Sequence, residues 1–202
     1  MEEFKKYIEI CNNRFSTHKA TIITDDSRYL AIDWRREDES GEYYINYILD
    51  KNRGVFIVSG DLGSSIAVWG NPVAPENVSG WVYSDIGYYI GKIQCSSDLY
   101  IYDEDDILAD IIDNLGEDGI KSLLENRPLY EDEDELKEAL ESFIGDSLYS
   151  RNTYIPSADL IEMISEVDPD YGEWLYECGK RIDARVYMWA IGFKMAMDQL
   201  KS

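Results

Sequence analysis

EYYINYILDKNRGVFIVSG, residues 42–60, has the pattern of a β-hairpin. In its first half the odd positions from Tyr43 to Leu49 fall on one face of a strand and the even positions on the other. The segment DKNRG then supplies a turn, in which Gly54 is free to take a positive φ. The second half, VFIVSG, returns as a strand, so this stretch predicts an antiparallel sheet.

Two more strands are predicted upstream of the hairpin. KATIIT (19–24) and RYLAIDW (28–34) are β-branched or alternating runs, separated by the turn-forming residues 25–27. Before them, MEEFKKYIEICNNRF (1–15) has the mixed-charge amphipathic pattern of a helix. We therefore expect an amino-terminal helix followed by four strands in a meander.

The glycine turn SGDLGSS (59–65) follows the hairpin and raises the question of phosphate binding. It lacks the G-K-[ST] ending of a P-loop and the G-x-G-x-x-G fingerprint, and Asp61 would repel a phosphate. We predict a tight connection between sheet and helix in which Asp61 caps the turn or the helix. Ser64 or Ser65 would start a short helix carrying Ile66, Ala67 and Trp69. A role for Asp61 as acid or base beside a second carboxylate stays open.

The rest of the chain is predicted to be mainly helical, with Ser157 and Asp168 as N-caps. We expect an α+β fold in which the helix and the small sheet pack against helices, followed by an acidic helical half. The predicted division is 1–97 and 98–202, unless the two parts form one continuous domain. The predicted helices cover 75–82, 84–95, 103–115, 119–126, 131–145, 157–167, 170–180 and 183–202.

Composition limits the classes of partner. The chain has 202 residues, of which 45% are hydrophobic, and its 41 acidic and 19 basic residues give a net charge of -22. Such a chain repels nucleic acids and anionic membranes, so its expected partners are cations or basic proteins. No run approaches the roughly 18 apolar residues of a membrane span, and residues 1–15 lack the pattern of a signal peptide. We expect a cytoplasmic protein.

Cysteine and histidine give little sign of a metal or cofactor site. Cys11, Cys95 and Cys178 lie far apart without a C-x-x-C or Cys/His spacing, which predicts buried, reduced thiols. His18 is the only histidine, and we expect it to be structural. The aspartates near residue 105 lack the glycine of an EF-hand loop, which leaves weak binding of Mg²⁺ or Ca²⁺. No cofactor is expected.

The negative charge is concentrated between Asp98 and Asp170, where 23 acidic residues face 4 basic ones. Helical spacing puts Asp106, Asp110 and Asp113 on the solvent side of a helix. The stripe predicted to be buried beneath them consists of Ile107, Leu108, Ile111, Ile112 and Leu115.

Two explanations of these acids stay open. Acids favour helix N-termini through the macrodipole, which would make the region a solvated face only. Alternatively, closely spaced carboxylates imitate the phosphates of duplex DNA and occupy a basic channel. The residues predicted to bind a partner are Asp103, Glu104, Asp105, Asp106, Asp110, Asp113, Glu131, Asp132, Glu133, Asp134, Glu135 and Glu138.

Several motifs together resemble a family of small proteins encoded by bacterial prophages and mobile elements, mostly of unassigned function. The motifs are IDW (32–34), EYYINYILD (42–50), GVFIVSGDLGSSIAVW (54–69), KIQCSSDLY (92–100) and RVYMWAIGFKMAMDQL (185–200). Acidic phage proteins of this size include anti-CRISPR and anti-restriction proteins, several of which look like nucleic-acid mimics. The resemblance implies inhibition of a host defence nuclease without naming the target.

The resulting hypothesis is a non-enzymatic inhibitor that binds a basic nucleic-acid-handling protein, such as a CRISPR effector, through its acidic surface. One alternative is a carboxylate- or metal-dependent hydrolase. Another is an acidic adaptor or structural phage protein whose charge only keeps it in solution.

Overall fold

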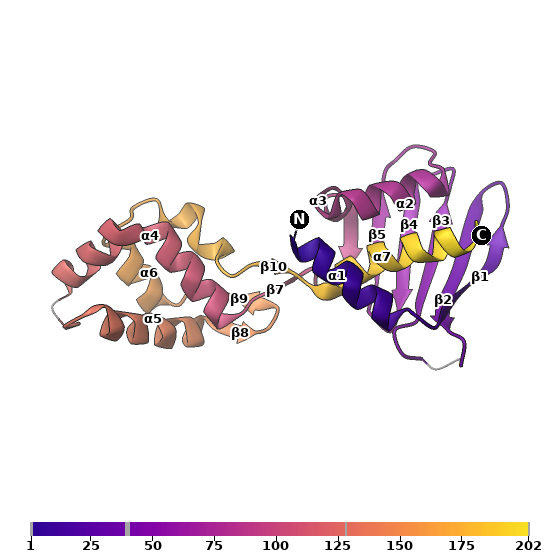
Figure 1. Cartoon of the computed structure of the whole chain (residues 1–202). Coiled ribbons are helices and arrows are strands. Elements are labelled where there is room, and N and C mark those ends of the chain that lie inside the picture. The colour runs from indigo at the N-terminus through magenta and orange to yellow at the C-terminus, as the bar shows by residue number, and fades with distance from the viewer. Residues whose placement is uncertain (1, 39–40, 128, 202) are drawn as a thin grey trace. The chain divides into compact units, whose positions relative to one another are not determined.

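The chain forms two compact units in a computed structural model that describes residues 2–38, 41–127 and 129–201 (Figure 1). The sheet unit comprises Met1–Leu99 and Asp183–Ser202, and the helical unit comprises Tyr100–Ile182. The first boundary lies close to the predicted division at residue 98. Residues 183–202 differ from the prediction, because their helix packs on the sheet instead of joining the acidic part. The fold is α+β, as predicted.

The sheet unit is built on one six-stranded antiparallel sheet with strand order β1-β2-β3-β4-β5-β6. The hairpin at residues 42–60 is confirmed. Asp50 pairs with Val55 across a turn in which Gly54 has φ 61°. The elements of this unit are α1 (Glu2–Arg14), β1 (His18–Asp25), β2 (Tyr29–Arg36), β3 (Ile45–Asp50), β4 (Val55–Gly60), β5 (Ser65–Val68), α2 (Pro75–Ser84), α3 (Ile86–Ile90), β6 (Ile93–Ser96) and α7 (Ala184–Gln199).

The predicted short helix after Gly63 is wrong, because residues 65–68 form strand β5. The turn at Gly60–Gly63 returns the chain along β4, so that Val58 pairs with Ser65. The buried Ser65 hydroxyl bonds the Tyr89 hydroxyl at 3.0 Å, which ties the strand to α3. The predicted helix at 84–95 is also shorter than expected, since it ends at Ile90 and the chain continues as the edge strand β6.

Helix α7 fills the space over one face of the sheet. It contacts both α1 and α2 and crosses the strands on the same side as α1 (Figure 1). Ten of its sixteen residues are buried, an all-round apolar pattern typical of a central helix. Gly192 lets it approach closely, because a Cβ there would lie 2.6 Å from the Tyr47 hydroxyl oxygen. That hydroxyl donates to the carbonyl of Trp189 at 3.0 Å.

The helical unit packs α4, α5 and α6 around its own apolar core. Gly116, with φ 60° and ψ −176°, breaks α4 into two segments, which matches the two helices predicted on either side of it. Core residues include Ile111 on α4, Leu140 on α5 and Ile164 on α6. The elements are β7 (Tyr100–Ile101), α4 (Glu104–Asn126), α5 (Glu133–Ser147), β8 (Leu148–Ser150), β9 (Thr153–Tyr154), α6 (Ala158–Ser165), the 3₁₀ turns η1 (Tyr171–Glu173) and η2 (Leu175–Glu177), and β10 (Arg181–Ile182).

One predicted N-cap is confirmed and the other is wrong. The Ser157 hydroxyl accepts from the Leu160 amide and starts α6. The Asp168 carboxylate instead accepts from the Asp170 amide and the Trp174 indole, at 2.8 Å each. Because that side chain holds a turn, the predicted helix at 170–180 becomes two 3₁₀ turns.

The three cysteines are free, but only Cys11 and Cys178 are buried, so the expectation of burial is wrong for Cys95. Cys95 lies on the edge strand β6, where the side chain reaches solvent. His18 is 3% exposed, and its Nε2 lies 3.3 Å from the Tyr43 carbonyl oxygen, as expected of a structural histidine. Burial lowers the pKa of this imidazole.

Candidate partner-binding surface

Part of the predicted acidic surface serves the helix starts. The Asp103 carboxylate accepts from the Asp105 amide at 3.1 Å and caps α4. At α5, Asp132 accepts from the Glu135 amide at 3.0 Å, and the Glu135 carboxylate accepts from the Glu131 amide at 2.8 Å. These contacts satisfy backbone donors that lack helical partners. The explanation by helix N-termini therefore holds for Asp103, Asp132 and Glu135 through direct hydrogen bonds. Five more of the predicted acids lie in the first turns of α4 and α5, where the macrodipole favours negative charge: Glu104, Asp105, Asp106, Glu133 and Asp134.

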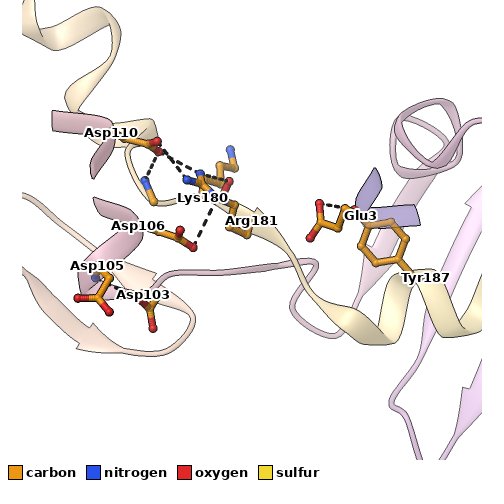
Figure 2. Close-up of polar contacts among 9 residues, drawn as sticks. Glu3, Asp103, Asp105, Asp106, Asp110, Lys180, Arg181 and Tyr187 are labelled. Atoms are coloured by element: carbon orange, nitrogen blue, oxygen red, sulfur yellow. Dashed lines mark hydrogen bonds and ion pairs between the residues drawn. The ribbon is translucent and has the colours of Figure 1, made fainter. Parts of the chain in front are cut away.

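Asp106 and Asp110 both contact Arg181 (Figure 2). Two guanidinium nitrogens of Arg181 donate to the two carboxylate oxygens of Asp110, both at 3.0 Å. The Gly179 amide adds a third bond at 2.8 Å, and Asp106 lies 3.5 Å from the guanidinium. Arg181 and the Gly179 amide hold the pKa of the Asp110 carboxyl below its usual value. Both side chains remain on the predicted solvent side, 44% and 31% exposed, but each is engaged by a base that the sequence did not pair with it and that lies 71 residues beyond Asp110.

We expect Arg181→Met to destabilise the helical unit by about 1–2 kcal/mol at neutral pH, because charge-assisted hydrogen bonds are lost and partial exposure limits the effect. The pKa of Asp110 is lower in the folded state, so the stabilisation is full above about pH 4 and is lost as the pH falls through the lowered value. Urea unfolding at a series of pH values from 7 to 2, monitored by hydrogen exchange of the α4 amides, measures both effects.

Lys121→Met is the matched control, since it removes one positive charge from an exposed pair with Glu125 at 3.8 Å. We expect it to cost about 0.3 kcal/mol at most. An equal loss in the two variants, or a loss for Arg181→Met that does not shrink as the pH falls from about 4 to about 2, would contradict the assigned role of Arg181.

The other seven predicted residues are exposed: Glu104, Asp105, Asp113, Glu131, Glu133, Asp134 and Glu138. Glu104 and Asp105 lie at the start of α4 in a shallow hollow that they share with Arg151. Asp113 and Glu133, from α4 and α5, line one groove together. The structure therefore brings the two predicted helices together, but their acids have different roles. Some cap α4 and α5, two pair with Arg181, and seven are exposed without such a role. We call these seven residues the acidic surface.

The groove lies between α4 and α5 and has a volume of about 580 Å³. Ile112, Ile120 and Leu124 supply its apolar lining, and Asp113, Glu117 and Glu133 supply carboxylates. A smaller hollow of about 140 Å³ shares Ile112, Ile120 and Glu133 and adds Asp134 and Lys137.

Sequence reasoning missed the groove. It placed Ile112 in the buried stripe of α4, but this side chain is 38% exposed. The break at Gly116 ends the regular spacing on which that assignment rests. Glu117 and Arg181 were also missed. Helical spacing beyond Gly116 would have pointed to Glu117, whereas no local signal marks Arg181 as the partner of Asp110.

Most bases of the helical unit are neutralised within it. The unit contains 24 acidic and 6 basic residues, a net charge of −18. Five of the six bases form ion pairs there, of which the shortest join Arg127 to Glu166 and Lys180 to Glu177, both at 2.6 Å. The Glu166 carboxylate also has a lowered pKa because Arg127 donates to it. The negative charge of the acidic surface is therefore little neutralised by bases of its own unit.

The glycine turn at residues 59–65 has a structural role. The Asp61 carboxylate accepts from the amide of Tyr43, which itself has φ 56°, at 2.9 Å. Asp61 therefore holds the turn to the segment just before β3, as expected of a turn cap, and does not cap a helix. The connection joins two strands of the sheet instead of a strand and a helix.

Among the described side chains, no three His, Cys, Asp or Glu residues are placed to hold a metal ion. Every helix in the described ranges is too short or too polar to cross a bilayer. Comparisons with protein-family models, with curated proteins and with solved structures found no match. The resemblance to prophage proteins stays a prediction.

Proposed function

We propose that the protein binds a basic nucleic-acid-handling protein, such as a CRISPR effector nuclease, and inhibits it without catalysis by competing with nucleic acid. The acidic surface of the helical unit makes the contact. The observation that carries this proposal is the unit's charge of −18, with five of its six bases already paired internally.

Physical chemistry supports a protein partner of positive charge. Apart from the helix starts and the pair of Asp110 with Arg181, folding gains little from so many like charges, because neighbouring carboxylates on a helix each cost a few tenths of a kcal/mol. Exposed charge of one sign does speed association with an oppositely charged surface and excludes anionic partners. A basic channel that normally holds phosphates presents the complementary charge.

The test uses a guide-loaded RNA-guided nuclease and a fluorescent DNA target, with DNA binding followed by anisotropy as the protein is added. We expect inhibition to be complete near equal molar amounts and to be relieved by excess DNA. Raising salt from about 0.05 to about 0.5 M should weaken it, because the screening length shortens several-fold.

Three matched variants locate the contact, and each changes the net charge from -22 to −19. One neutralises Glu104, Asp105 and Asp113, and a second neutralises Glu133, Asp134 and Glu138, in each case as the amides. The control neutralises Glu9, Glu37 and Glu76, which are exposed in the sheet unit. We expect each of the first two variants to weaken inhibition more than the control, which should have little effect, and the six changes combined to weaken it about tenfold, within the range of electrostatic effects on association.

Equal inhibition by all variants at all salt concentrations would contradict the proposed contact. Inactivation of the nuclease by far less than one equivalent, with chemical change of the target, would contradict the non-enzymatic mechanism. A nuclease-treated bacterial lysate passed over the immobilised protein extends the test to other basic proteins, with elution by duplex DNA as the readout.

A further inference from the structure

The groove between α4 and α5 combines an apolar lining with an acidic rim. Its rim carries Asp113, Glu117 and Glu133, and the smaller hollow beside it adds Asp134. Lys121 lines the groove and Lys137 lines the smaller hollow, but each lies within 4 Å of a glutamate one turn further along its helix. The rim therefore carries a net negative charge around exposed apolar side chains. Imitation of nucleic-acid phosphates would require the charge but not the apolar side chains.

The apolar lining comes from both segments of α4. Ile112 precedes the break at Gly116, whereas Ile120 and Leu124 follow it. Across the groove, Leu136 and Leu140 of α5 extend the lining, although both are 1% exposed. The volume of about 580 Å³ lies within the range of sites that hold a sizeable ligand.

We propose that this groove receives an amphipathic helix of the partner protein, with apolar side chains on one face and lysine or arginine on both edges of that face. Grooves between helices commonly bind such helices through residues at i, i+3, i+4 and i+7. The basic edges would lie against Asp113 and Glu117 on one side and against Glu133 and Asp134 on the other.

The negative charge of the rim favours a basic amphipathic helix over the other molecules that could occupy an apolar groove. A second copy of the chain carries a net charge of -22 and would bring further acids to the rim. Nucleic acid and anionic lipid are repelled for the same reason. The inference rests on the proposed function, since it assigns the basic partner a specific helical contact, and it adds that the contact includes an apolar component that salt does not screen.

The probe is a fluorescent peptide of roughly 18 residues, about five helical turns, made of leucine and lysine with the leucines on one face. A second peptide has the same composition in an order that spreads the leucines around the helix. Binding is measured by anisotropy at about 0.15 M and about 0.5 M salt, where the screening length falls from about 8 Å to about half of that value. We expect the amphipathic peptide to bind about tenfold more tightly than the second peptide at both salt concentrations.

Ile112→Gln removes an apolar side chain from the groove without changing charge, and we expect it to abolish the preference for the amphipathic peptide. Because Ile112 is 38% exposed, the variant should remain folded, which thermal unfolding by circular dichroism verifies. Ile155→Gln is the matched control, since Ile155 is 53% exposed in the same unit and does not line the groove. The control should keep the preference.

The outcomes separate this inference from the proposed function. Equal binding of the two peptides, or an unchanged preference in Ile112→Gln, overturns the helix-binding groove while leaving electrostatic binding of basic partners intact. Failure of both peptides to bind even at about 0.05 M salt, where the screening length exceeds 10 Å, overturns the groove and also contradicts the attraction on which the proposed function depends.

Discussion

Replacing Gly192 by valine is expected to lower the free energy of unfolding of the sheet unit by about 4 kcal/mol, which combines overpacking with a lost buried hydrogen bond. A Cβ at this position would lie 2.6 Å from the Tyr47 hydroxyl oxygen and 3.3 Å from atoms of Ile45 and Phe15. Tyr47 cannot move aside easily, because its ring packs at 5.0 Å from Phe193 and its hydroxyl donates to Trp189. Displacing the ring would leave the buried Tyr47 hydroxyl without its hydrogen-bond partner.

The measurement is urea unfolding followed by tryptophan fluorescence in a Trp174→Phe background, so that the signal comes from the sheet unit alone. Gly80→Val is the matched control in α2 of the same unit, where a Cβ would meet nothing within 4 Å. We expect the control to change stability by less than about 0.5 kcal/mol, since valine is only slightly better than glycine in a helix. Similar midpoints for the two variants would refute the close packing of α7 on β3.

Gly179→Ala is expected to destabilise the helical unit by about 3–4 kcal/mol, from a steric clash and from a positive φ that L-residues rarely adopt. Gly179 has φ 68°, and a Cβ there would lie 2.2 Å from Ile107 Cγ1 and 2.9 Å from the Ile107 amide nitrogen. The second contact is with backbone in the first turn of α4, which cannot rotate away. Moving the segment would also stretch the bond from the Gly179 amide to Asp110.

Hydrogen–deuterium exchange resolves this effect by unit. We expect amides of α4 and α5 to exchange faster, while those of β2 to β4 are unchanged. Gly172→Ala serves as the control in the same unit, because a Cβ there meets nothing within 4 Å. Protection of α4 equal to that in the parent protein would mean that residue 179 tolerates a side chain and that its contact with Ile107 is not a constraint on the fold.

The sequence predicts those parts of the fold that are specified by neighbouring residues. The hairpin at 42–60 is predictable because alternation and the turn at Gly54 lie within one short segment. Strand β5 was missed because four residues, SIAV, are too short to show a period, and the contact of Ser65 with Tyr89 that holds it is 24 residues away. Similarly, α7 was predicted as a helix, but its place on the sheet depends on residues that precede it by more than a hundred positions.

The candidate site shows the same limit. Capping of α4 by Asp103 and of α5 by Asp132 follows from local sequence, since acids at helix starts satisfy free amides. The role of Asp110 does not, because Arg181 reaches it through tertiary folding alone. Charge counting therefore located the acidic helical unit but did not distinguish carboxylates that stabilise it from those that are exposed to solvent.

The insertion of the helical unit into the sheet unit has a consequence for biosynthesis. The ribosome completes all six strands before it makes the 83 residues of Tyr100–Ile182, and α7 emerges only after them. At about 5–20 residues per second, that delay lasts roughly 4–17 s. During this interval Tyr47 and Phe56 lack Phe193, which packs on them at 5.0 Å and 4.6 Å in the finished protein. Until α7 is made, the nascent sheet therefore exposes this aromatic surface to chaperones. The helical unit is made as one continuous segment, so it can fold before the sheet unit is complete.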